Sequence, residues 1–309
     1  MAAPERCRSF IAAVMLTGLL AACATGPQQP DPETRQQALW EAEAMAWRER
    51  RLARLTEPYG WLSLVGLEFL ENGQWTLGSA PGNDLVVPAG PEQWGQLMVI
   101  GTRAWFDVEP AASGEVRVDG HSVASAEIHA SGEQGPTLVE AATVQLQLLE
   151  RSGRLALRVR DSQAATRTQF AGLDYFPFNP DWRIEARWEA HPPGRTLLIA
   201  NVLGELIHEP NPGAAEFEID GRTFGLEAVD SGDQLFFIFA DRTTNRETYG
   251  LGRFLYSDLP SDGRVVLDFN RAYSPPCAFT EYSTCPLPPP ENRLDTRVEA
   301  GELAPKPAY

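Results

Sequence analysis

The stretch LSLVGLEFLENGQWTL, residues 62–77, decides the fold class of this chain of 309 residues. Two short apolar runs, 62–70 and 74–77, flank the pair Asn72-Gly73. Asn-Gly between two apolar runs is a strong sequence signal for a two-residue β-hairpin turn. The stretch therefore predicts two strands that pair across this turn.

Short apolar runs broken by Gly, Pro, Asn and Asp continue beyond this stretch. In one of them Leu155, Leu157 and Val159 alternate with Ala156 and Arg158, which is the period of a half-buried strand. No helical stretch of useful length separates the runs, and this argues against a parallel, doubly wound sheet. We predict a mainly β protein with two β-rich units, the first sandwich-like and the second sandwich or barrel-like. The further runs are 97–100, 105–108, 116–118, 144–149 and 155–159.

One helix is expected before the strands. Asp31, Pro32 and Glu33 follow the order of an N-cap, a first-turn proline and an early acid. Apolar residues then recur near helical spacing until Pro58 stops the pattern. The sequence therefore predicts a helix over 32–57. The recurring residues are Trp40, Ala44, Trp47 and Leu55.

The N-terminus has the pattern of an export signal. Arg6 and Arg8 precede an uncharged apolar stretch over 10–20, which is too short to cross a bilayer as a helix of about 20 residues. Residues 20–23, Leu-Ala-Ala-Cys, are similar to the lipobox of bacterial lipoproteins. We therefore expect a signal peptide over 1–22 and lipid attachment at Cys23.

The expected anchor determines where the protein should lie. Several acyl chains on Cys23 would hold it firmly at a membrane, because each buried methylene contributes about 0.8 kcal/mol. Ala24 follows the cysteine, so the aspartate that signals inner-membrane retention is missing. We predict a cell-envelope lipoprotein, attached to the outer membrane and facing the periplasm.

The remaining chain divides by composition. Residues 23–31 are rich in Pro and Gln and poor in apolar side chains, as in a tether. The expected N-terminal unit covers 58–172, the expected C-terminal unit covers 173–303, and 304–309 form a tail. The formal net charge of −16 argues against nucleic acid as a partner, because phosphate binding needs clustered Lys and Arg.

Part of the N-terminal unit is similar to a known sandwich. Residues 75–79, Trp-Thr-Leu-Gly-Ser, and 83–87, Asn-Asp-Leu-Val-Val, resemble the opening hairpin of forkhead-associated β-sandwich domains. Ser79 stands where those domains need arginine, and their Ser-x-x-His element is missing. The resemblance therefore implies a scaffold and no phosphothreonine site.

The C-terminal unit contains dense polar motifs. They are Asp241-Arg242-Thr243, the run 248–254, the run 268–279, Cys285-Pro286, Glu291-Asn292 and Ala300-Gly301-Glu302. In these motifs the chain resembles the bacterial lipoprotein family catalogued as domain of unknown function 1684 (DUF1684). Members usually have asparagine where this chain has Ser274. The resemblance implies a location and an architecture, and it implies no activity.

The cysteines allow one pairing in the exported protein. Cys7 would leave with the signal peptide and Cys23 would carry lipid, so Cys277 and Cys285 remain. The periplasm favours oxidation, and we predict a disulfide between them. A zinc site would need two further ligands, and 209–309 contains no other Cys and no His. We predict no metal and no cofactor.

The candidate binding site lies around Asp268, Asn270 and Tyr273. Over 265–270 the strand period would place Val265, Leu267 and Phe269 on one face, with Asp268 and Asn270 side by side on the other. Asp241 and Arg253 are expected alongside, with Arg253 forming a two-pronged bond to Asp268 or Asp241. The alternative is a buried ion-pair network that only holds loops together.

Known catalytic signatures are missing. In the run 78–82, Gly-Ser-Ala-Pro-Gly, the serine stands one position too early for a nucleophile elbow, and no two histidines lie four residues apart.

Three hypotheses about the function remain open. The first is a binding or interaction module with a polar pocket in the C-terminal unit for a small polar ligand, a glycan or an envelope protein. The second is a hydrolase of unrecognised type using Asp241, Asp268 and Tyr273. The third is a purely structural envelope lipoprotein.

Overall fold

The computed structural model describes residues 1, 31–132, 135–151 and 153–306. Nearly all of the predicted signal peptide and of the predicted tether lies outside the described residues, as do 307–309 of the predicted tail. No helix in the described part of the chain is long and apolar enough to span a bilayer.

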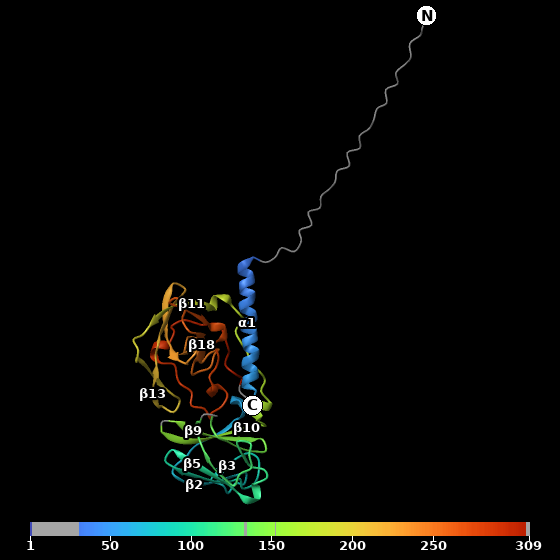
Figure 1. The fold of residues 1–309 in the computed structure, drawn as a ribbon. Helices are drawn as coiled ribbons and strands as arrows, with labels where there is room; N and C mark the ends of the chain where they lie inside the picture. Colours follow the sequence, from blue (N-terminus) through green and yellow to red (C-terminus); the bar gives the residue numbers. More distant parts are fainter. Residues whose placement is uncertain (2–30, 133–134, 152, 307–309) are drawn as a thin grey trace.

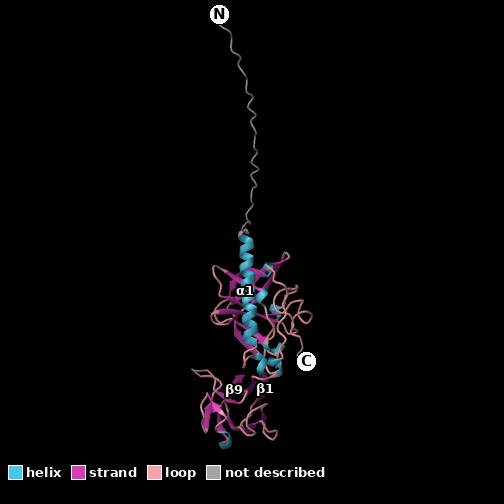
Figure 2. Cartoon of the chain, turned by 90° about the vertical axis from the view of Figure 1, so that its right-hand side faces the viewer, coloured by secondary structure: helices cyan, strands magenta, loops and turns pink. Residues whose placement is uncertain are grey.

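The first element is helix α1, Pro32–Leu55. The side chain of Asp31 accepts a hydrogen bond from the Thr34 amide at 2.9 Å, which confirms the predicted N-cap. Ala44, Arg51 and Leu55 are buried on one side of the helix. Figures 1 and 2 show α1 lying along the C-terminal unit, with the N-terminal unit beyond the end of the helix. The helix is therefore one wall of the C-terminal unit.

The N-terminal unit is a sandwich of two five-stranded sheets. One core cluster fills the space between them and takes Leu77 and Leu97 from one sheet and Leu146 and Leu157 from the other. The sheet nearer the C-terminal unit, seen with β9 and β10 in Figure 1, has the order β1-β10-β9-β8-β6, and the outer sheet has the order β3-β2-β4-β5-β7. The strands are β1 Leu64–Phe69, β2 Gly73–Gly78, β3 Leu85–Val86, β4 Gly95–Ile100, β5 Arg103–Val108, β6 Arg117–Val118, β7 Ser125–Ile128, β8 Leu138–Ala141, β9 Val144–Arg151 and β10 Arg154–Asp161.

The hairpin predicted at Asn72-Gly73 is wrong. Strand β1 pairs with β10, whereas β2 pairs with β3 and β4, so the chain changes sheets at this point. A type I′ turn needs positive φ at both central residues, but only Gly73, at 143°, has it. Asn72 instead uses its side-chain oxygen to accept a hydrogen bond from the Gly101 amide at 2.7 Å.

Strand β10 is also more deeply buried than its alternation predicts. All five residues from Leu155 to Val159 are buried, so the half-buried interpretation is wrong. The inner face packs into the sandwich core. On the outer face, Arg158 lies 5.4 Å from the ring of Trp61, and this cover leaves Arg158 only 7% exposed. The outer face of β10 is covered by a tertiary contact, which the local sequence pattern does not predict.

The C-terminal unit has a core of its own, lined by Phe217, Phe237, Leu255 and Leu267. These residues come from a four-stranded sheet, β15-β14-β11-β19, and a three-stranded sheet, β16-β17-β18. Strands β12 and β13 form a separate pair, and no sheet within 173–303 closes into a barrel, so the layered alternative is the one observed. The strands are β11 Arg183–Ala190, β12 Thr196–Ala200, β13 Leu206–Pro210, β14 Gly213–Ile219, β15 Arg222–Glu227, β16 Val229–Asp230, β17 Gln234–Phe239, β18 Arg253–Asp258 and β19 Arg264–Asp268.

Short helices connect these elements. They are α2 Ala165–Thr168 and the 3₁₀ turns η1 Trp61–Ser63, η2 Pro110–Ala112, η3 Pro180–Trp182, η4 Phe269–Arg271, η5 Pro276–Ala278 and η6 Pro290–Asn292.

Candidate functional site

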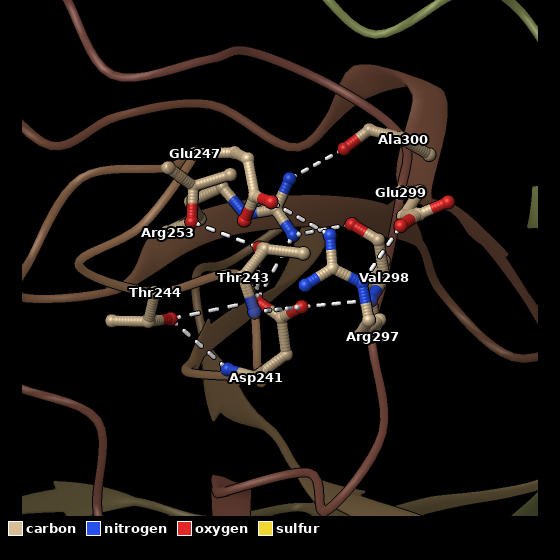
Figure 3. A network of polar contacts seen from close by, with 10 residues as sticks. Asp241, Thr243, Thr244, Glu247, Arg253, Arg297, Val298, Glu299 and Ala300 are labelled. Carbon is tan, nitrogen blue, oxygen red and sulfur yellow. Dashed lines mark hydrogen bonds and ion pairs between the residues drawn. The ribbon is translucent and has the colours of Figure 1, made fainter.

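Asp241 and Arg253 form a buried ion pair (Figure 3). Asp241 follows β17, and Arg253 is the first residue of β18. One guanidinium nitrogen of Arg253 lies 3.1 Å from Asp241 and also donates to the carbonyl of Val298 at 3.0 Å. The other terminal nitrogen donates to the carbonyl of Ala300. The pair therefore fastens the segment 298–300 to the start of β18.

The remaining bonds of Asp241 close this network. The carboxylate accepts from the Thr243 hydroxyl at 2.9 Å and from the Val298 amide at 2.7 Å. Both charged side chains are 0% exposed, and burial lowers the pKa of Arg253 from its ordinary value while Asp241 opposes that shift. Of the side-chain nitrogens and oxygens of Asp241 and Arg253, only the Nε of Arg253 has no hydrogen-bond partner among the described residues. The buried ion pair therefore offers no exposed charged group to a ligand.

Asp268 and Asn270 lie side by side, as predicted, but not on a continuing strand. Strand β19 ends at Asp268, which caps η4 by accepting from the amide of Asn270 at 3.2 Å and from its side-chain nitrogen at 3.1 Å. The cations beside Asp268 are Arg183 at 3.4 Å and Arg271 at 3.1 Å. Arg253 therefore pairs with Asp241 through one nitrogen, and the expected two-pronged bond is not formed.

Tyr273 belongs to a row of aromatic rings. Phe236 and Tyr256 stack with centroids 4.7 Å apart, and Tyr256 and Tyr273 lie nearly parallel at 6.5 Å and 11°. Trp47 of α1 lies 5.9 Å from Tyr273. Burial raises the pKa of Tyr273 well above its ordinary value, so its hydroxyl stays protonated. Tyr256 is 38% exposed and is the most exposed ring of this row.

Trp47, Tyr256 and Tyr273 of this row line a large cleft between α1 and strands β18 and β19. Its volume is about 1350 Å³, and charged residues of both signs surround the rings. Asp268 and Tyr273 line this cleft, whereas Asp241, Arg253 and Asn270 do not. Of the five predicted site residues, two therefore line the cleft and three belong to the surrounding structure. The charged lining residues are Glu43, Arg50, Arg54, Arg183, Glu185, Asp258, Asp262, Arg264, Asp268 and Arg271.

The contribution of α1 was missed from the sequence. Trp47 and Arg51 fall on the helix side that faces the C-terminal unit, and Arg51 pairs with the buried Glu302 at 3.2 Å. Arg51 also lies 4.6 Å over the ring of Tyr273. The position of Arg51, four residues after Trp47 and four before Leu55, is the signal that could have placed it on the buried stripe.

Within the described residues, no group of three or more His, Cys, Asp and Glu side chains is arranged to hold a metal ion. The cleft contains planar cations, carboxylates and aromatic faces. This lining can form hydrogen bonds and stacking contacts with a polar ring.

Cys277 and Cys285 form the predicted disulfide, with Cα atoms 6.1 Å apart. The bond closes the segment that follows Tyr273, and Tyr249 donates from its hydroxyl to the carbonyl of Cys277 at 2.9 Å. The disulfide thus fixes the backbone next to the cleft.

Replacing both cysteines by alanine should lower the free energy of unfolding by about 2 to 3 kcal/mol, because a short loop of this length restrains the unfolded chain only modestly. Urea unfolding of the variant and the wild type measures the difference. Titration of the non-reduced protein that found free thiols at both Cys277 and Cys285 would contradict the pairing.

Comparison with known proteins identifies the C-terminal unit. Residues 168–303 match the family model described as "Protein of unknown function (DUF1684)". No curated protein matches the chain. A solution NMR structure of an uncharacterized protein from Haloarcula marismortui is 35% identical, with 44% of this chain and 78% of that chain covered and a TM-score of 0.37. Through residues 168–303, the chain belongs to the DUF1684 family.

Proposed function

We propose that this protein is a lipid-anchored envelope protein whose C-terminal unit binds a glycan in the cleft beside α1. The observation that carries the proposal is the aromatic row that contains Tyr256, a ring 38% exposed in a cleft lined by charged side chains. The anchor rests on the lipobox-like residues before Cys23.

A sugar ring suits this lining for physical reasons. Its C–H bonds form an apolar face that packs against an aromatic ring, and its hydroxyls need donors and acceptors around the edge. Tyr256 offers the ring, while Arg54 and Asp258 line the same cleft. The disulfide and the Asp241–Arg253 network hold the surrounding backbone in place, which lowers the entropy lost on binding.

A hydrolase using Asp241, Asp268 and Tyr273 is less well supported. Asp241 does not line the cleft that Asp268 and Tyr273 share, and its carboxylate is fully occupied by Arg253, Thr243 and Val298. An acid and a base must both reach the reacting atoms.

Tyr256→Ala should weaken glycan binding at least about tenfold, because removing a central aromatic contact commonly costs 2 kcal/mol or more. The measurement is binding of the purified protein to an array of neutral and acidic oligosaccharides, followed by titration calorimetry with the ligands found. Thermal unfolding checks that the variant remains folded.

Tyr282→Ala is the matched control, since Tyr282 is partly exposed and lines neither this cleft nor the smaller one described below. It should leave affinity unchanged. Wild-type protein that bound no oligosaccharide, or a Tyr256→Ala variant that bound as well as wild type, would overturn the proposed function and leave the structural hypothesis.

A further inference from the structure

A second cleft, of about 490 Å³, opens where the two units meet. Its walls come from the end of α1, from η1, from β10 of the N-terminal unit and from β17 and β18 of the C-terminal unit. It shares Arg54, Tyr256 and Tyr273 with the large cleft, so the two clefts adjoin at these residues. Junctions between units are common places for ligands.

Three arginines line this smaller cleft, and only one of them has a carboxylate partner within the described part of the chain. Arg51 is paired with Glu302. Arg54 is exposed and makes no side-chain hydrogen bond or ion pair with any described residue. Arg160 is half-buried and meets only neutral amides, Gln147 at 2.7 Å and Gln145 at 3.5 Å. Two guanidinium groups therefore lack an anion.

The single carboxylate among the lining residues is Glu57. It forms no ion pair with Arg54 or Arg160, and its side chain is exposed. The charge of the lining is therefore positive on balance, in a protein whose formal net charge is −16.

A fourth arginine, Arg158, contacts Trp61 of the cleft lining but does not line the cleft itself. Arg158 is on the same face of β10 as Arg160, is 7% exposed and packs on Trp61, which lines the cleft. It makes no hydrogen bond or ion pair with the described residues, and its Nε is buried without a partner. Burial and the nearby Arg160 and Arg151 lower the pKa of Arg158 to about 10. A nearby anion would offset the cost of this desolvated charge.

We infer that the smaller cleft binds an oxyanion, a carboxylate or a phosphate, through Arg54 and Arg160, so that the glycan of the large cleft is an acidic one. The inference rests on the proposed function for the identity of the ligand. The anion site itself rests on the arginines alone. Guanidinium groups bind both oxyanions through paired N–H donors, and a ligand lying over Tyr256 would reach both clefts.

The test compares trigalacturonate with its fully methyl-esterified form, which has the same rings without the charges. Calorimetry with wild-type protein should give at least about tenfold tighter binding for the acid, because hydrogen bonds to charged groups are worth more than neutral ones. Arg54→Gln and Arg160→Gln should each remove most of this difference. Arg35→Gln, the same change at an exposed position of α1 outside both clefts, should preserve it.

Inorganic phosphate, titrated alone, separates the sources of the anion. Phosphate binding that is lost in Arg54→Gln and kept in Arg35→Gln supports the anion site even if no saccharide binds, and in that case only the proposed glycan function fails. Equal affinity for the acid and the ester, with no phosphate binding, overturns the anion site and leaves the glycan function standing. A folded Arg54→Gln variant that binds both anions as wild type does also overturns it.

Discussion

Arg253→Gln should lower the free energy of unfolding by about 3 to 5 kcal/mol, because it leaves the carboxylate of Asp241 buried without its counter-charge. The pair is 0% exposed on both sides, so water cannot replace the lost partner. The carbonyls of Val298 and Ala300 also lose their donors. Asp241→Asn should cause a loss of similar size. Urea unfolding of the purified variants measures both.

The control is Arg264→Gln, which removes an arginine from an exposed pair. Arg264 and Glu185 are each 61% exposed, and exposed pairs contribute about 0 to 1 kcal/mol. A small loss of unfolding free energy in Arg264→Gln and a large loss in Arg253→Gln would show that the Asp241–Arg253 network stabilises the fold. Unchanged stability of Arg253→Gln together with lost glycan binding would instead make the pair part of a binding site.

Cys23→Ala should transfer the protein from the membrane fraction to the soluble fraction. Without acyl chains on residue 23, the free energy of membrane binding would lose about 0.8 kcal/mol for each methylene that is no longer buried in lipid. Fractionation of cells, with mass spectrometry of the N-terminal peptide of the wild type, measures location and acylation together.

Cys7→Ala serves as the comparison, since residue 7 lies within the proposed signal peptide and should not affect the anchor. A Cys23→Ala protein that stayed in the membrane fraction, or a mature wild-type chain starting at an unmodified residue other than Cys23, would rule out this anchor.

The sequence predicted those parts of the fold that depend on local pattern. Helix α1 begins at the proline after the Asp31 cap and ends at Leu55, within two residues of the predicted end. The Asn72-Gly73 hairpin failed because pairing was decided by distant strands: β10 binds β1, and β4 binds β2. Burial of Arg158 likewise depends on Trp61, which lies far away in the sequence.

The candidate site was predicted only in part, because it too depends on both local pattern and tertiary packing. The burial of Val265, Leu267 and Phe269 followed from strand period, and Asp268 beside Asn270 followed with it. Which charges would face a cleft depends on how α1 packs across the C-terminal unit. No local sequence pattern predicts that Trp47 and Arg54 line the same cleft as Tyr256.

The most direct test of the binding account is a crystal structure of the protein soaked with trigalacturonate. We expect density in the cleft beside α1, with a sugar ring over Tyr256 and a carboxylate within hydrogen-bonding distance of Arg54 or Arg160. Density for the saccharide at another surface, with this cleft empty, would contradict it.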